Sequence, residues 1–221
     1  MSEQWNSKMT KEKELLNLAK VRQQTTYEGY KSIADYEDGF YECDYVSPYS
    51  KSANNVNAEV FVVLQDWSSD DNMHGKCHET NRLGYTPNVS TNIKLIQYLK
   101  KYLNLELSET YSTNLFPFIK MGDMSANIPI KDMRQAAQDF TLPMIHIIKP
   151  KVVIALGRKT YSALWDCCDN KVEVTDSSFK YGTTKVFHQP HPAARISNLE
   201  KERRWFEMKE YLDLTTANNI R

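Results

Sequence analysis

A carboxylate, an amide and an imidazole each stand at or just after a run of strand-forming residues. Asp66 ends the run VVLQD, Asn114 ends the run STN, and His191 lies in the segment HQPHPAAR. An ionised Asp66 could stabilise a developing cation, the Asn114 amide could read a planar polar group, and His191 could donate a hydrogen bond to a departing oxyanion. Together these groups suit the cleavage of a bond across which charge separates.

The three residues can cooperate only if the fold brings the ends of their strands together. Apolar, β-branched runs predict strands at residues 60–64, 111–118, 151–156 and 184–188, while residues 172–174 form a weaker strand or loop. Apolar spacing predicts helices between the strands, and Pro143 predicts a kink in one of them. The predicted core faces are formed by Ile93, Ile96, Leu99 and Leu103; by Met133, Ala137, Phe140, Met144 and Ile148; by Tyr161, Leu164 and Trp165; and by Trp205, Met208 and Leu212.

The alternation of strands and helices predicts the fold class. It indicates an α/β protein of three layers, αβα, with a central, mostly parallel four-stranded sheet. In open α/β sheets, ligands bind outside the carboxyl ends of the strands. The segments that follow the four strands therefore outline one candidate site, at residues 65–71, Asn114, residues 157–160 and residues 188–195.

The first 57 residues differ from the rest. Residues 1–35 carry one apolar stripe and predict an amphipathic helix, formed around Leu15, Leu16, Leu18 and Ala19. Residues 35–57 are rich in Tyr, Ser, Asn and acidic side chains, which predicts a long irregular connection of the kind that often carries function. We therefore expect residues 1–57 to pack on a single α/β domain at residues 58–221.

Length and composition exclude several classes of protein. The chain has 221 residues, 41% of them hydrophobic, and 28 Lys plus Arg balance 28 Asp plus Glu. This balance argues against disorder and against a basic coat, so any nucleic acid contact must come from a local patch. The sequence has no apolar run long enough for a membrane span and does not begin like a signal peptide, which predicts a cytoplasmic protein without membrane contact. The cysteines have no scaffold spacing and are expected to be free thiols: Cys43, Cys77, Cys167 and Cys168.

Two further groups of residues have both a functional and a structural interpretation. His74, Cys77 and His78 form HxxCH, whose residue types suit zinc, but no fourth ligand is evident. We therefore expect no metal at these residues and interpret them as a polar loop beside the pocket. Arg158 and Lys159 could cradle a phosphate at a helix start, or could simply be solvated. Six cations of the C-terminal quarter could form a patch for DNA phosphates, although Glu200, Glu202 and Glu207 could instead pair with some of them: Lys180, Lys185, Arg195, Lys201, Arg203 and Arg204.

Five motifs in fixed order resemble the uracil-DNA glycosylase superfamily. VVLQD is similar to the superfamily's GQDPYH motif, HPAAR is similar to its HPSP-type loop, and RLGY, STN and VVIALG lie between them. The resemblance covers about residues 58–212 and implies a glycosylase-like fold. It implies that Asp66 activates water or stabilises the sugar cation, that Tyr85 stacks on the flipped base, that Asn114 reads the base edge and that His191 stabilises the leaving base.

Two departures from the superfamily pattern affect the expected substrate. Uracil-specific members have Pro-Tyr after the motif Asp, where this chain has Trp67-Ser68, and a Ser in place of that Tyr should leave room for a group at the 5-position of the base. The chain also lacks the CxxC of the iron–sulfur members, so we expect no cluster and no other cofactor.

The sequence therefore predicts a monofunctional DNA glycosylase that flips out and excises a uracil or a 5-modified pyrimidine, such as the hydroxymethylated or glucosylated cytosines of phage DNA, to leave an abasic site. A DNA- or nucleotide-binding protein of the same fold without catalysis is the alternative. DNA is the expected partner, and no obligatory protein partner is evident. The predicted catalytic residues are Asp66 and His191; the base-binding residues are Gln65, Ser68, Tyr85 and Asn114; the DNA-binding residues are Arg158, Lys159, Pro192, Ala193 and Arg195.

Overall fold

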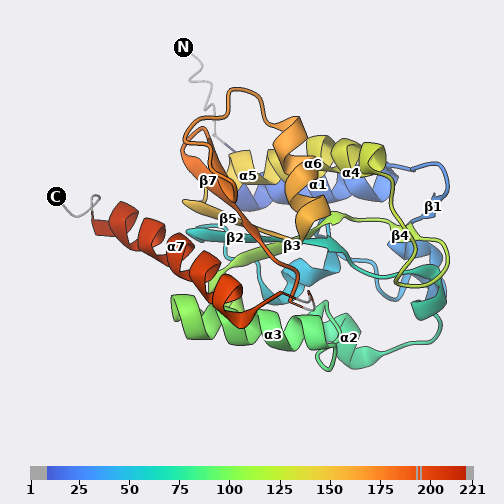
Figure 1. The fold of residues 1–221 in the computed structure, drawn as a ribbon. Coiled ribbons are helices and arrows are strands. Elements are labelled where there is room, and N and C mark those ends of the chain that lie inside the picture. Colours follow the sequence, from blue (N-terminus) through green and yellow to red (C-terminus); the bar gives the residue numbers. More distant parts are fainter. Residues whose placement is uncertain (1–8, 193, 195, 218–221) are drawn as a thin grey trace, which may run out of the picture.

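Five strands form the central sheet in the computed structural model, which describes residues 9–192, 194 and 196–217 (Figure 1). Four of them run parallel, and β6 is antiparallel to β7. Their order across the sheet is β3 (Tyr111–Phe116), β2 (Val60–Asp66), β5 (Val152–Leu156), β7 (Thr184–Gln189) and β6 (Ser178–Tyr181). The mixed α/β class and the mostly parallel sheet are confirmed.

The expected count of four strands is wrong, because an additional strand closes one edge of the sheet. The weak strand predicted at residues 172–174 is reduced to a single bridge between Val172 and Lys180. The strand forms instead at Ser178–Tyr181, whose sequence SFKY holds two polar residues. An edge strand is covered on fewer sides than a central one, so its apolar signal in the sequence is weak.

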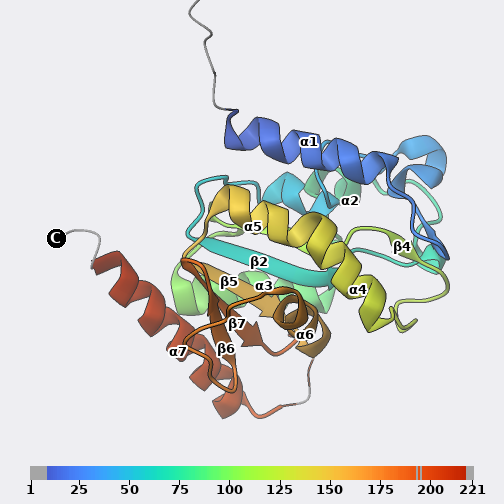
Figure 2. The same ribbon diagram turned by 90° about the horizontal axis from the view of Figure 1, so that it is seen from above.

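Four helices cover one face of the sheet (Figures 1 and 2). They are α1 (Lys11–Gln24), α4 (Ile130–Ala136), α5 (Leu142–Ile148) and α6 (Arg158–Cys167). A π-helical turn at Ala137–Thr141 joins α4 to α5 just before Pro143, where the sequence predicted a kink. The core face predicted for this helical pair is confirmed, since its members are all buried: Met133, Ala137, Phe140, Met144 and Ile148.

The opposite face is covered by α3 (Ser90–Tyr98), a π turn at Leu99–Leu103 and α7 (Asn198–Ala217), with α2 (His78–Leu83) nearby. In α7, Trp205 and Met208 are buried as predicted. Of the face predicted for α3 and the π turn, Leu99 is fully buried, and Ile96 and Leu103 are partly buried against the core. The prediction is wrong at Ile93, which is 41% exposed, while Leu95 is fully buried instead. At residues 92–103 several adjacent positions are apolar, so the sequence pattern fits two neighbouring faces.

The N-terminal region packs as a helix and an irregular segment. The helix predicted within residues 1–35 is shorter and ends at Gln24, after which the chain forms β1 (Tyr30–Lys31), antiparallel to β4 (Ile119–Lys120). The fully buried Arg22 of α1 donates two hydrogen bonds to the Glu42 carboxylate, at 2.7 and 2.5 Å. This pair attaches the irregular segment to α1.

Short 3-10 helices interrupt the remaining loops, at Ile33–Asp35, Glu37–Gly39, Pro48–Ser52, Asp70–Asn72 and Leu107–Glu109. All four cysteines are free thiols, as expected. Within the part of the chain that the structure describes, no helix combines the length and the apolar character needed to cross a membrane.

Candidate functional site

A cavity of about 720 Å³ lies at the carboxyl ends of the parallel strands. The ends of β2 and β5 contribute Asp66 and Leu156, and β3 contributes Asn114 two residues before its end. His191 follows the end of β7. The strand register holds these ends together, since Leu64 pairs with Asn114 and Leu156 pairs with Gln189. All six residues predicted to act on the ligand line this one cavity: Gln65, Asp66, Ser68, Tyr85, Asn114 and His191.

The Asp66 carboxylate is held at both of its oxygens. The Gln65 side-chain amide donates a hydrogen bond to Oδ1 at 2.7 Å, and Lys120 Nζ lies 2.8 Å from Oδ2. Only 6% of the Asp66 side chain and 3% of the Lys120 side chain are exposed. The sequence pattern does not reveal Lys120, which follows the apolar run FPFI and carries no motif of its own.

The Asn114 amide is oriented by a residue from the irregular segment. The buried Ser47 hydroxyl donates to Asn114 Oδ1 at 2.6 Å and accepts a hydrogen bond from the backbone N–H of Tyr49 at 3.3 Å. With its oxygen used in this way, Asn114 has its amide nitrogen to offer a ligand, and this group is a donor. Asn114 itself is 1% exposed, so only a ligand inside the cavity can reach it.

The irregular segment also supplies part of the cavity wall, a role that the sequence did not reveal. Tyr41 and Tyr49 both line the cavity. Tyr49 stacks on Tyr85, with ring centroids 5.3 Å apart and an angle of 28° between the planes. One face of Tyr85 is thus committed to packing while the residue remains part of the wall. The aromatic composition of residues 35–57 was the signal that could have indicated this role.

His191 lines the cavity while remaining exposed to solvent. Partial burial of its ring lowers the pKa of His191, Lys94 acts in the same direction, and the negative charge of Asp66 opposes both. The neutral form therefore predominates near pH 7, and neutral imidazole can donate a hydrogen bond through one nitrogen. Gly157 lies close by, since a Cβ atom added to this glycine would lie 3.8 Å from His191 Cβ.

The residues predicted to contact DNA are less completely assembled. Arg158 and Lys159 are exposed at the start of α6 and are not among the described residues of the cavity wall; Lys159 hydrogen bonds to Asn127. Pro192 is buried, and its carbonyl accepts a hydrogen bond from Lys94 at 3.4 Å. Ala193 and Arg195 lie outside the described residues.

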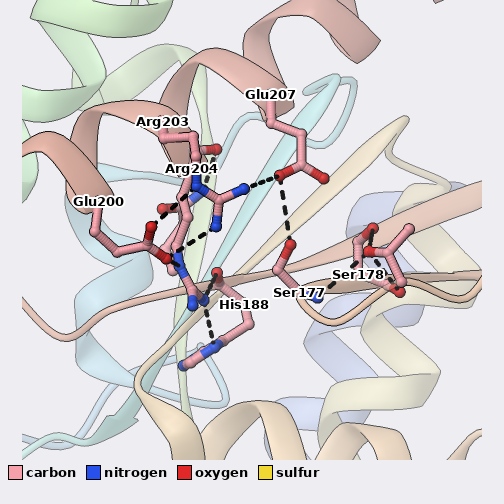
Figure 3. Close-up of polar contacts among 9 residues, drawn as sticks. Ser177, Ser178, His188, Glu200, Arg203, Arg204 and Glu207 are labelled. Carbon is pink, nitrogen blue, oxygen red and sulfur yellow. Dashed lines mark hydrogen bonds and ion pairs between the residues drawn. The ribbon is translucent and has the colours of Figure 1, made fainter.

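Four of the six cations named for the C-terminal quarter have acidic partners, and Figure 3 shows those of Arg203 and Arg204. Arg203 and Arg204 both pair with Glu200, at 2.9 and 2.6 Å, as the structural interpretation of the sequence anticipated. Lys180 and Lys185 both pair with Glu173, at 2.9 and 3.6 Å. The positive charge of these four side chains is therefore partly neutralised. They should bind DNA phosphates more weakly than four unpaired cations would.

Arg204 also fixes the end of β7 to α7. Its Nη1 lies 2.9 Å from His188 Nδ1 (Figure 3). The Gln189 side chain donates to the Arg204 carbonyl at 3.0 Å. Burial lowers the pKa of His188 from 6.5 to about 4, and the charges of Arg204 and Arg158 act in the same direction. A neutral His188 is thus part of the anchor from which the His191 loop departs.

Acidification should destabilise the protein through His188. The unfolded chain takes up a proton at His188 as the pH falls below 6.5, whereas the folded protein resists protonation until about pH 4. The free energy of unfolding should therefore fall between these pH values, by at most about 3 kcal/mol. His188→Asn keeps an acceptor for Arg204 but removes the titration, so its free energy of unfolding in urea should depend less on pH. His78→Asn, at an exposed histidine, is the control, and equal pH dependence in wild type and His188→Asn would contradict the prediction.

The HxxCH residues border the cavity without forming a cluster of ligands. His74 and Cys77 line the wall, whereas His78 packs edge-on against Phe40 at 5.2 Å. Among residues 9–192, 194 and 196–217, no three His, Cys, Asp or Glu side chains are grouped so that they could hold a metal ion. The segment that holds His74 and Cys77 therefore lies where the structural interpretation placed it, as a polar loop beside the cavity.

The assembled site offers a fixed carboxylate, an amide donor and a neutral imidazole around one aromatic cavity. No protein-family model matches this chain. No curated protein matches it either. The geometry of the cavity is therefore the basis on which a reaction can be assigned.

Proposed function

We propose that this protein is a monofunctional DNA glycosylase of the uracil-DNA glycosylase type, which hydrolyses the N-glycosidic bond of a flipped pyrimidine nucleotide. The observation that supports the proposal most strongly is the convergence of Gln65, Asp66, Ser68, Tyr85, Asn114 and His191 on one cavity at the strand ends. These residues come from four separate parts of the sequence, and each was expected at the site from its motif.

In the proposed reaction, Asp66 acts on the sugar and His191 acts on the departing base. As the glycosidic bond breaks, positive charge develops on the sugar and negative charge on the base. The Asp66 carboxylate stabilises the sugar cation and orients the water that adds to it. The neutral His191 ring donates a hydrogen bond to the departing base, where the bonding electrons have gone. The products are an abasic sugar and the free base.

The base is held by the aromatic wall and by Asn114. The Asn114 amide nitrogen donates to an acceptor on the base edge, because Ser47 already occupies Oδ1. Tyr85 presents a ring edge or its remaining face to the base, since Tyr49 covers the other face. DNA must deliver the base by flipping it out of the stack, since Asn114 is buried.

The size of the cavity favours a pyrimidine with a substituent. A volume of about 720 Å³ is within the range of pockets that hold drug-sized molecules, which are much larger than one pyrimidine ring. Trp67 lines the cavity but is fixed against its wall, since its indole N–H donates to the Gly84 carbonyl at 2.8 Å. Ser68 also lines the cavity with a small side chain, so we place the 5-substituent beside it.

Ser68→Tyr should remove activity on 5-substituted pyrimidines while sparing or improving the excision of uracil. A Tyr ring would fill the space that the substituent needs, whereas Ser leaves it open and offers a hydroxyl. Initial rates on the two kinds of base, compared within each variant, measure the effect. Ser68→Ala is the matched control and should keep both activities, because it preserves the space. A wild-type enzyme that excises only uracil, together with no change in Ser68→Tyr, would refute the enlarged pocket.

The function itself is tested by incubating the purified protein with defined DNA. Duplexes and single strands carrying uracil, 5-hydroxymethylcytosine or glucosylated 5-hydroxymethylcytosine are treated with alkali, which cleaves the strand at any abasic site. We expect alkali-dependent cleavage at the pyrimidine that fits the cavity. Binding to these strands without any base release would instead support the non-catalytic DNA-binding alternative.

A further inference from the structure

Lys120 is a buried cation placed directly against the Asp66 carboxylate. The Lys120 side chain is 3% exposed, and its Nζ lies 2.8 Å from Asp66 Oδ2. The same ammonium donates a hydrogen bond to the Met124 carbonyl at 2.7 Å. Burying a charge is costly unless it is paired and hydrogen bonded. Lys120 and Asp66 therefore depend on each other in the folded protein.

Backbone pairing brings Lys120 to this position. In the small sheet, Lys120 of β4 lies opposite Tyr30 of β1. Ser69, which follows the Asp66 strand, forms a parallel bridge with Lys120. The ammonium thus approaches one carboxylate oxygen from the small sheet, while Gln65 holds the other oxygen from within β2. This arrangement fixes the plane of the carboxylate.

We propose that Lys120 is a positioning residue, which keeps the Asp66 carboxylate charged and oriented toward the cavity. The effect on rate rests on the proposed glycosylase function. A carboxylate that is buried without a cation takes up a proton, and a protonated Asp66 cannot stabilise a sugar cation. Lys120 is not among the described residues that line the cavity, so it acts through Asp66 and not on the substrate.

Lys120→Met should lower the turnover number for base release by about tenfold or more, with little change in the KM for DNA. Lys120→Arg keeps the charge and should recover part of the loss. The matched control is Lys31→Met on the paired strand β1. Lys31 Nζ lies 2.9 Å from Asp70 Oδ1, and its side chain is 45% exposed, so the loss of this pair should leave the turnover number unchanged. A Lys120→Met enzyme with the wild-type turnover number would overturn the proposal.

A double substitution separates positioning from a general structural role. If Lys120 acts through Asp66, then Lys120→Met should have little further effect on the rate when Asp66 is already Asn. An equal rate loss from Lys120→Met in both backgrounds would overturn the proposal.

Borohydride treatment tests a direct chemical role for Lys120. A lysine that attacked the sugar would form a Schiff base with it, and reduction would link protein and DNA covalently. We expect no such link at Lys120 in the wild-type protein. A borohydride-dependent adduct that disappears in Lys120→Met would show that Lys120 is a nucleophile, and would overturn a positioning role.

Thermal unfolding tests the pair without any activity. Lys120→Met should lower the Tm by roughly 6–12 °C, because it leaves a buried carboxylate uncompensated. Asp66→Asn combined with Lys120→Met should have a smaller effect than the sum of the two single substitutions. If the wild-type protein releases no base, the proposed function fails, but the Tm coupling between Lys120 and Asp66 can still be measured. Additive Tm losses from Lys120→Met and Asp66→Asn would show that the two side chains do not stabilise each other.

Discussion

Replacing Asp66 by Asn should lower the rate of base release by about a hundredfold or more, and His191→Ala should have an effect of similar size. In the proposed reaction, both groups act on charge that is absent from the bound substrate and appears as the glycosidic bond breaks. Their loss should therefore reduce the turnover number while the affinity for DNA changes little. Single-turnover rates of abasic-site formation, measured beside equilibrium binding to the same duplex, separate the two quantities.

The control for these variants is their folding. Asp66→Asn leaves the Lys120 ammonium buried with a neutral neighbour, so its Tm must be recorded with its rate. His191 is exposed to solvent, and His191→Ala should fold with nearly the stability of wild type. Full activity in either folded variant would refute the assignment of the reaction to these residues.

Gly84→Ala should strongly destabilise the protein, with a loss of about 2–5 kcal/mol in the free energy of unfolding. Gly84 ends α2 with a φ of 78°, and a Cβ atom there would lie 1.8 Å from the Pro48 carbonyl oxygen. That oxygen belongs to backbone and cannot rotate away. The substitution must push apart the segments that carry Tyr49 and Tyr85, so activity should fall with stability.

Gly29→Ala is the matched control for this substitution. Gly29 has a nearly equal φ of 82°, but no atom within 4 Å of an added Cβ. It should therefore show only the cost of a left-handed backbone in a residue with a side chain, about 1–2 kcal/mol. Urea unfolding of the two variants measures the difference. Equal losses in both would show that the contact with Pro48 contributes nothing.

The layers of this fold could be predicted from the sequence because its central strands are buried on both faces. Runs such as VFVVL have no polar residue to confuse the pattern, and the paired core faces of α4 and α5 follow a strict helical period. The edge strand β6 could not be located this way, since half of its residues are polar. The strand β4 was not predicted either, because the strand predicted at residues 111–118 stops just before Ile119 and a two-residue strand carries too little pattern to be recognised.

The candidate site could be predicted where a residue follows a strand, and not where it comes from a loop. Asp66, Asn114 and His191 are found by their place at strand ends, which the sheet brings together. Ser47, Tyr49 and Lys120 reach the site through tertiary packing of irregular segments and short strands. A local pattern gives no information on such packing, and a buried lysine is read as a surface residue by default.

The groups proposed to react and part of the aromatic wall come from different parts of the fold, and this separation matters for how the protein could diversify. The reactive groups stand on the ends of sheet strands, whereas Tyr41, Tyr49 and Ser47 come from one irregular segment attached to α1 through Arg22 and Glu42. Insertions or exchanges in that segment can reshape the space offered to a ligand without altering the strand pairing beneath it. Chimeras that swap only this segment between related chains should therefore inherit the donor's ligand preference and keep the recipient's chemistry.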